Sequence, residues 1–309
     1  MTDVLPEAGE PVDEVGRPGL GAGAGLRADD GLPRAVPPSR ADALLAGDDA
    51  RALHRGAPRV TTNPRRTTVT LGSEAEVVAT ELGAPGTRGP TLVLVHGIGV
   101  SGRYFAPLAD VLARDHDVLV PDLPGFGRSP RGGQRPTIED LAATLRDYLR
   151  AAELDRPVLV GHSMGAQVVV EAMRQAPGAA RRGVCIGTVI DSRARNPVRQ
   201  ALRLARDGLH EPLRANAIIT SDYLRAGPRW YTAMLRPMLG YATEEAAAQV
   251  SDELLFVRGE KDPICTRRWQ AELAAAAPRG RSAEVAGAGH VAMYTHPEDV
   301  AALVLGEVP

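Results

Sequence analysis

The stretch of residues 157–171 constrains the fold of this chain more than any other. It begins as a short apolar run, which predicts a buried strand, and ends as a helix that starts near Met164. Between the two lies the motif Gly161-x-Ser163-x-Gly165. A serine on so sharp a turn has a strained backbone and a hydroxyl that stands clear of the sheet edge, and a Cβ at either glycine would crowd the turn. The pattern predicts a nucleophilic serine facing the N–H groups of a helix N-terminus; an ordinary glycine-rich turn with an idle serine is the alternative.

The rest of the chain predicts an α/β protein, because strand and helix patterns alternate from residue 91 onwards. This order is typical of a mostly parallel sheet with helices on both faces. Before it, residues 67–71 and 75–82 predict a hairpin at the sheet edge. The later strands are expected at 91–95, 117–120, 158–160, 184–190, 254–257 and 282–285, and the helices at 104–113, 138–152, 266–275 and 298–305.

Two segments depart from this alternation. Residues 192–250 have helical periodicity and no clear strand, which predicts a helical cap over the carboxyl ends of the strands, where open α/β sheets bind ligands. The core then consists of residues 61–191 and 251–309. Residues 1–60 are rich in Gly, Pro, Ala and charge, so they predict a disordered or weakly helical tail; a docking or oligomerisation arm is the alternative.

Composition argues against several classes of function. A formal net charge of −2 over 309 residues indicates neither nucleic acid nor another polyanion as a partner. No apolar run approaches the ~20 residues of a membrane span. The N-terminus carries Asp3, Glu7 and Glu10 without an apolar core, so a cytoplasmic protein is expected. Cys185 and Cys265 lie far apart and form no CxxC pair, which predicts neither a metal site nor a disulfide framework.

Five loops taken together resemble those of the α/β-hydrolase fold family, in its serine-nucleophile branch with a helical cap. The resemblance covers about residues 65–309 and keeps the family's order of nucleophile, acid and histidine. It implies an oxyanion hole made by the backbone N–H groups of Ile98 and Met164, with Gly99 as a substitute donor. The five loops are His96-Gly97, Asp122-x-x-Gly125-x-Gly127-x-Ser129, Gly161-His162-Ser163-Met164-Gly165, Gly259-x-x-Asp262 and Gly289-His290.

Three side chains have the chemistry of a catalytic triad. The Ser163 hydroxyl is a poor nucleophile unless a base takes its proton, and His290, which ends a glycine-rich loop late in the chain, is the candidate base. Asp262 is the candidate acid that fixes the tautomer of His290, and its position matches the family's usual acid. Asp191 also follows an expected strand and is the alternative acid. His162 must point away from the nucleophile, so packing or a hydrogen bond is expected for it.

The expected function is that of a serine hydrolase that cleaves a carboxylic ester, a lactone or a related acyl compound through an acyl-enzyme. One alternative is hydrolysis of a carbon–carbon bond next to a ketone, or a biosynthetic step, on the same triad; another is a non-catalytic ligand receptor. A small-molecule substrate is expected, with no metal or other cofactor, and the sequence leaves the oligomeric state open. The candidate substrate contacts are Gly99, Tyr223, Trp230, Tyr231, Met234 and Met238. For the five cap side chains among them, packing of the cap onto the core is the alternative.

Overall fold

The computed structural model describes residues 64–72, 75–83, 87, 89–133, 135–194 and 213–306. The tail expected over residues 1–60 lies outside these ranges, as does the part of the expected cap between residues 195 and 212. All of the described residues belong to one compact unit, Gly56–Pro309.

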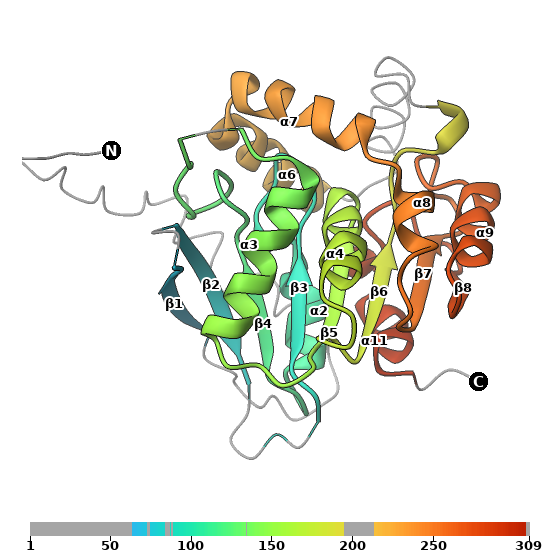
Figure 1. Cartoon of the computed structure of the whole chain (residues 1–309), viewed down its shortest axis with the longest axis horizontal. Helices are drawn as coiled ribbons and strands as arrows, with labels where there is room; N and C mark the ends of the chain where they lie inside the picture. The colour runs from blue at the N-terminus through green and yellow to red at the C-terminus, as the bar shows by residue number, and fades with distance from the viewer. Residues whose placement is uncertain are drawn as a thin grey trace, which may run out of the picture. The chain divides into compact units, whose positions relative to one another are not determined.

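An eight-stranded sheet forms the centre of this unit, with the strand order β1-β2-β4-β3-β5-β6-β7-β8 (Figure 1). The first two strands form the expected antiparallel hairpin, and β2 also pairs antiparallel with β4. All pairs from β4 through β3 to β8 are parallel. The strands are β1 Arg65–Thr70, β2 Glu76–Leu82, β3 Leu92–Val95, β4 Val118–Pro121, β5 Val158–His162, β6 Arg182–Ile186, β7 Leu254–Gly259 and β8 Gly280–Val285.

Helices cover both faces of the sheet, as the alternation predicts, because the middle strands are apolar on both sides. Side chains from α3, α4, α8 and α9 build the core on one face, and those from α2, α10 and α11 build it on the other. In Figure 1, α3 and α4 lie in front of the sheet and α2 and α11 behind it. The helices are α2 Ala106–Leu112, α3 Ile138–Ala151, α4 Met164–Gln175, α6 Leu213–Ala226, α7 Pro228–Gly240, α8 Thr243–Ala247, α9 Arg267–Ala276, α10 Ala292–Thr295 and α11 Pro297–Leu305.

Several element boundaries differ from the sequence prediction by one or two residues, and two differ in kind. The strand expected over residues 184–190 ends at Ile186, because Gly187 takes a positive φ of 55° and Ile190 one of 65°, which no strand can contain. The helix expected from Tyr104 starts as a 3₁₀ turn, η2 Gly102–Phe105, before α2 begins. A second 3₁₀ turn, η3 Ser192–Ala194, follows β6 at the point where the chain leaves the sheet.

The described part of the expected cap is helical and contains no strand. In Figure 1, α7 crosses above the ends of the central strands, and α6 lies below it in the view. By contrast, α8 packs against α4 and α9 on one face of the sheet. The segment after residue 213 therefore contributes both to a cover over the strand ends and to the helix layer of the core.

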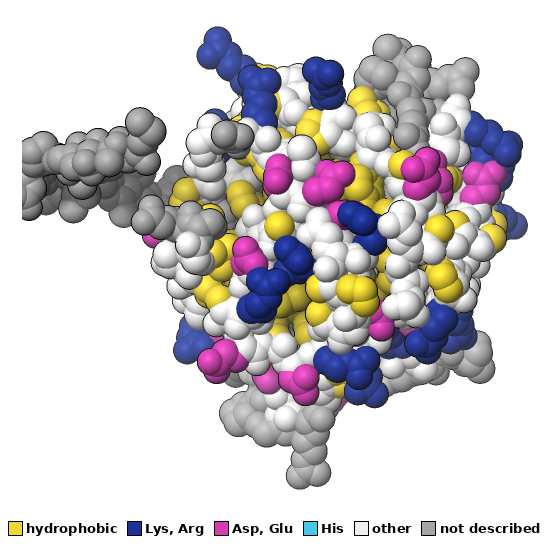
Figure 2. Space-filling model, in the orientation of Figure 1, with side chains coloured by type: hydrophobic (Ala, Val, Ile, Leu, Met, Phe, Trp, Pro, Cys, Tyr) yellow, Lys and Arg dark blue, Asp and Glu magenta, His cyan; other side chains and the backbone are white. Residues whose placement is uncertain are grey.

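Charged side chains of both signs are interspersed over the face drawn in Figure 2. Among the described residues, Leu224 on α6 is the one large hydrophobic side chain that is exposed, at 78%. None of the helices in the described ranges is both long and apolar enough to cross a membrane.

Candidate active site

Ser163 lies on the turn between β5 and α4 in a backbone conformation that a residue with a side chain rarely adopts. Its φ is 58° and its ψ is −119°, and its N–H donates to the carbonyl of Ile186 at 3.0 Å. The turn is tight enough that a Cβ at Gly161 would overlap the Gly165 carbonyl, and one at Gly165 would overlap the Val95 carbonyl. The two glycines of the motif therefore let three backbone segments meet around a strained serine.

The loop after β3 lies against this serine. A Cβ built on Gly97 would stand 3.4 Å from the Ser163 hydroxyl oxygen. His96 Nδ1 donates to the Gly97 carbonyl at 2.8 Å, while its Nε2 accepts the Leu123 N–H at 2.9 Å. Because a trans peptide directs its N–H opposite to its C=O, the bond to Gly97 also fixes the direction of the Ile98 N–H.

Met164 is the first residue of α4, so its N–H has no carbonyl of its own helix to bind. The structure thus places the N–H groups of Ile98 and Met164 on the two segments that border the serine hydroxyl. Donors in fixed positions are what a developing oxyanion requires.

His290 and Asp262 form a buried pair on the neighbouring loops, with 2.9 Å between His290 Nδ1 and Asp262 Oδ2. The other carboxylate oxygen accepts the N–H groups of Ile264 at 2.7 Å and Cys265 at 3.0 Å. A carboxylate only accepts, so Nδ1 carries the proton and Nε2 is left with a lone pair. Gly187 leaves room for the imidazole, since a Cβ there would lie 2.9 Å from His290 Cε1.

Asp191, the alternative acid, is ion-paired with Arg268, and its carboxylate accepts the Arg193 N–H at 3.0 Å. Arg268 also pairs with Glu272 at 2.5 Å. The structure therefore brings Asp262 to the imidazole of His290 and gives Asp191 an arginine partner at the start of η3.

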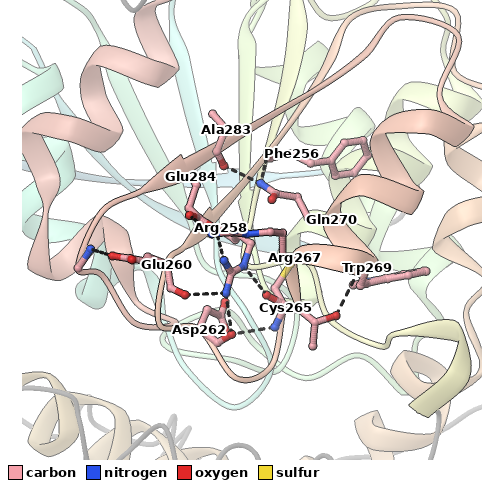
Figure 3. A network of polar contacts seen from close by, with 12 residues as sticks. Phe256, Arg258, Glu260, Asp262, Cys265, Arg267, Trp269, Gln270, Ala283 and Glu284 are labelled. Carbon is pink, nitrogen blue, oxygen red and sulfur yellow. Dashed lines mark hydrogen bonds and ion pairs between the residues drawn. The ribbon is translucent and has the colours of Figure 1, made fainter.

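Arg258, at the end of β7, binds the loop that carries Asp262 (Figure 3). Its guanidinium donates to the carbonyls of Cys265 at 2.8 Å, Glu260 at 2.9 Å and Asp262 at 3.1 Å. The side chain is 6% exposed and is ion-paired with Glu284. One cation thus holds both ends of the loop on which the Asp262 carboxylate is presented.

Two tyrosines of the expected cap lie directly on the loop after β3. Gly99 has a φ of 76°, and a Cβ there would fall 2.6 Å from the Tyr223 ring and 2.8 Å from the Tyr231 ring. Trp230 packs against Gly125 and edge-on against Phe126, with 6.3 Å between the ring centroids. These contacts place all three aromatic residues beside the loops that follow β3 and β4.

The two methionines of the expected pocket lie deeper. Met234 is 0% exposed and Met238 is 5% exposed, and both belong to the hydrophobic core. For these two residues the packing interpretation fits better than that of a substrate contact.

A buried carboxylate ties α6 to the same loop. Asp222 accepts the N–H of Ser101 at 3.0 Å and its hydroxyl at 2.7 Å, and pairs with Arg103 at 2.5 Å. Arg103 also donates to the Ser221 hydroxyl at 2.8 Å. The loop that presents Ile98 is therefore fixed by α6 as well as by His96.

Sequence reasoning missed Tyr104, Asp222 and Arg258 as parts of this site. The sequence could have indicated a role for Arg258, because a charged residue at the carboxyl end of an apolar strand is unusual. Tyr104 and Asp222 had no such feature, since the partners that attach them to the candidate site are 7 to 121 residues away in sequence. Among the described residues, no three His, Cys, Asp or Glu side chains form a group that could hold a metal ion.

Known proteins resemble this chain in sequence over most of its folded part. The family model of the alpha/beta hydrolase family matches residues 92–303. The polyketide synthase ThaQ of Burkholderia thailandensis is 29% identical in an alignment of 252 residues that covers 74% of this chain and 12% of that protein. The chain therefore spans a small part of the length of this relative.

Two further proteins match over most of their own length. A putative carbamate hydrolase, RutD, of Escherichia coli O17:K52:H18 is 26% identical over 261 residues, covering 75% of this chain and 92% of RutD. The crystal structure of the enol-lactonase from Burkholderia xenovorans LB400 matches with a TM-score of 0.66 at 20% identity, over 78% of this chain and 98% of that one. At this identity the structural likeness concerns the fold alone.

Proposed function

Since the chain belongs to the α/β-hydrolase family, we propose that it is a serine hydrolase that cleaves a carboxylic ester, a lactone or a related acyl compound through an acyl-enzyme. The observation that carries this proposal is the pair of His290 and Asp262, 2.9 Å apart. The candidate nucleophile, Ser163, is held at a φ of 58°. The ring of His162, which precedes that serine, is centred 4.6 Å from the His290 ring.

In the first step, Ser163 Oγ attacks the carbonyl carbon while His290 Nε2 takes the hydroxyl proton. Asp262 accepts a hydrogen bond from the Nδ1–H group of His290 and so keeps Nε2 available as the base; the negative charge of Asp262 then stabilises the imidazolium. The N–H groups of Ile98 and Met164 bind the oxyanion that forms on the carbonyl oxygen.

Collapse of the tetrahedral intermediate expels the alcohol or the ring oxygen, which receives the proton from His290. Water then enters, loses a proton to His290 and attacks the acyl carbon, and Ser163 leaves as a hydroxyl. Each proton passes through the same imidazole nitrogen, so the mechanism needs one fixed tautomer of His290 in both halves.

Tyr223, Trp230 and Tyr231 are proposed to contact the part of the substrate remote from the reacting bond. Their rings pack on the loops after β3 and β4, close to the proposed oxyanion donor on Ile98. Aromatic side chains at this position favour an apolar or aromatic acyl group.

A second candidate, also with acyl chemistry, is a biosynthetic step that hydrolyses or transfers a longer acyl chain. The similarity to a segment of a polyketide synthase favours it. Turnover of p-nitrophenyl esters can be compared with that of N-acetylcysteamine thioesters of the same acyl groups. A preference for the thioesters would favour this candidate over the simple esterase.

The proposal predicts covalent chemistry at Ser163. A fluorophosphonate probe is expected to label the wild-type protein at this residue, and Ser163→Ala is expected to lose both labelling and ester turnover. Peptide mapping by mass spectrometry identifies the modified residue. Turnover that survives in folded Ser163→Ala would place the nucleophile elsewhere and contradict the proposal.

A further inference from the structure

One chain of hydrogen bonds connects three loops of the candidate site. The Gly97 N–H donates to the Tyr104 hydroxyl at 2.9 Å, and this hydroxyl lies 2.8 Å from His162 Nδ1. His162 Nε2 lies 3.0 Å from the backbone carbonyl of His290. Tyr104 is 2% exposed and His162 is 3% exposed, so neither side chain is placed to touch a substrate.

The direction of every bond in this chain is set by its last member. A backbone carbonyl only accepts, so Nε2 of His162 carries the proton. Nδ1 of the neutral ring then accepts, and the Tyr104 hydroxyl donates to it while accepting the Gly97 N–H. Burial, together with repulsion from His290, lowers the pKa of His162 well below its ordinary value of 6.5, and burial raises the pKa of Tyr104, so both groups stay neutral.

Three groups of the proposed mechanism are attached to this series of hydrogen bonds. Gly97 precedes Ile98, the proposed oxyanion donor; His162 precedes Ser163; and His290 is the proposed base. The rings also pack on one another, with centroids 5.3 Å apart for Tyr104 and His162 and 4.6 Å apart for His162 and His290. The distance between oxyanion donor, nucleophile and base is thus set through two side chains outside the triad.

We propose that Tyr104 and His162 are positioning residues that hold the Ile98 N–H, Ser163 and His290 in register. This inference rests on the proposed function. Neither residue reacts; each acts through the backbone to which it is hydrogen-bonded. A displacement of this kind affects the transition state more than substrate binding, so it lowers kcat and leaves KM unchanged.

Tyr104→Phe removes the hydroxyl and keeps the ring. With p-nitrophenyl acetate, kcat is expected to fall about ten-fold or more with KM within about two-fold, because misplacing an oxyanion donor sacrifices part of the 10²–10³-fold effect of such a group. The matched control is Tyr148→Phe on α3, because the Tyr148 hydroxyl is buried and has no hydrogen-bond partner within the described part of the chain. It is expected to keep the wild-type kcat.

Two substitutions of His162 separate the hydrogen bond from the packing. His162→Gln retains an N–H that can reach the His290 carbonyl, whereas His162→Leu retains only bulk. The glutamine variant is expected to keep a kcat several-fold above that of the leucine variant. If Tyr104→Phe does not fold, the two His162 variants test the positioning role instead. Their kcat values are divided by the concentration of active sites, which is measured from complete labelling with the fluorophosphonate.

The outcomes distinguish this inference from the proposed function. Labelling of Ser163 combined with wild-type kcat in folded Tyr104→Phe and His162→Leu would overturn the positioning role and leave the hydrolase proposal intact. A lower melting temperature of these variants without any change in kcat would likewise mean that Tyr104 and His162 contribute only to packing and not to positioning. Wild-type protein that is not labelled at Ser163 would instead contradict the proposed function itself.

Discussion

At the residue level, two aspartates follow neighbouring parallel strands, and their environments separate their roles. Asp262 faces His290 Nδ1 and accepts two backbone N–H groups, whereas Asp191 is paired with Arg268. The first arrangement orients an imidazole, and the second neutralises a buried carboxylate beside η3. Being buried does not by itself make a carboxylate the triad acid, since both residues are 3% exposed.

Asp262→Asn is therefore expected to lower kcat by about 10⁴-fold, because the amide offers the wrong partner to His290 Nδ1. Asp191→Asn is expected to change kcat by no more than about ten-fold, or ~1.4 kcal/mol. Esterase kinetics on both variants, with matched circular dichroism spectra, measure the difference. The opposite ranking would assign the acid to Asp191.

From the sequence, we could predict the candidate site residues that a short local motif identifies. Ser163 lies in a five-residue motif, and His290 and Asp262 each end a glycine-containing loop after a strand. Tyr104, in contrast, was predicted only as a helical residue, because its two hydrogen bonds reach 7 and 58 residues along the chain. A single sequence contains no sign of contacts at such separations unless a motif marks both ends.

At the element level, the loop between β7 and α9 is held by Arg258 rather than by its own turn alone. Three hydrogen bonds to backbone carbonyls, two of them buried, and an ion pair with Glu284 converge on one guanidinium. Lysine keeps the charge but is a compact cation without the planar fork of donors. A buried carbonyl that loses its donor costs about 1–3 kcal/mol.

Arg258→Lys is expected to lower kcat by roughly ten-fold, since the Asp262 carboxylate loses its fixed position, and to lower the melting temperature. Arg281→Lys on the adjacent strand β8 is the control, because Arg281 is 68% exposed and pairs with Glu253 only at 3.9 Å. Kinetics and thermal unfolding of the two variants provide the test. Equal behaviour of both would mean that the loop holds its shape without the guanidinium.

Element prediction succeeded where apolar runs coincide with strands and failed where the chain turns inside such a run. The apolar residues 184–190 predicted a strand, yet β6 ends at Ile186 because Gly187 has a φ of 55°. Thr188 to Ile190 are buried for another reason, since they pack beside α9, where Trp269 donates to the Thr188 carbonyl at 3.2 Å. Burial outside a strand leaves the same hydrophobic pattern in the sequence.

At the level of the whole molecule, the alternation of strands and helices was sufficient for the sheet, its parallel pairing and its two helix layers. The division of residues 213–247 between a cover and the helix layer was not predictable from periodicity. Asp222 on α6 binds the loop after β3, while Gln167 on α4 donates to the Met238 carbonyl and the Thr243 hydroxyl, both at 3.2 Å. These buried polar contacts attach the helices at both ends, and no apolar pattern encodes them.

Two buried histidines make the stability of the folded chain depend on pH. Burial lowers the pKa of His96 below 6.5, against the opposing charges of Asp122 and Asp222, and lowers the pKa of His162 further still. In the unfolded chain both rings bind protons near pH 6.5, whereas in the fold each ring binds its proton only at a lower pH. The unfolded state therefore binds more protons as the pH falls below 6.5, and folding stability falls with it.

The contribution of these two histidines to the free energy of unfolding is expected to be complete above about pH 7.5 and to decrease below pH 6.5 by up to ~1.4 kcal/mol per pH unit for each histidine. Urea titrations between pH 7.5 and 5 measure this slope. His162→Gln removes one of the two groups and should reduce the slope, because the glutamine binds no proton in either state. A slope equal to that of the wild type would mean that His162 is protonated in the fold as readily as in the unfolded chain, which its hydrogen bonds to Tyr104 and the His290 carbonyl oppose.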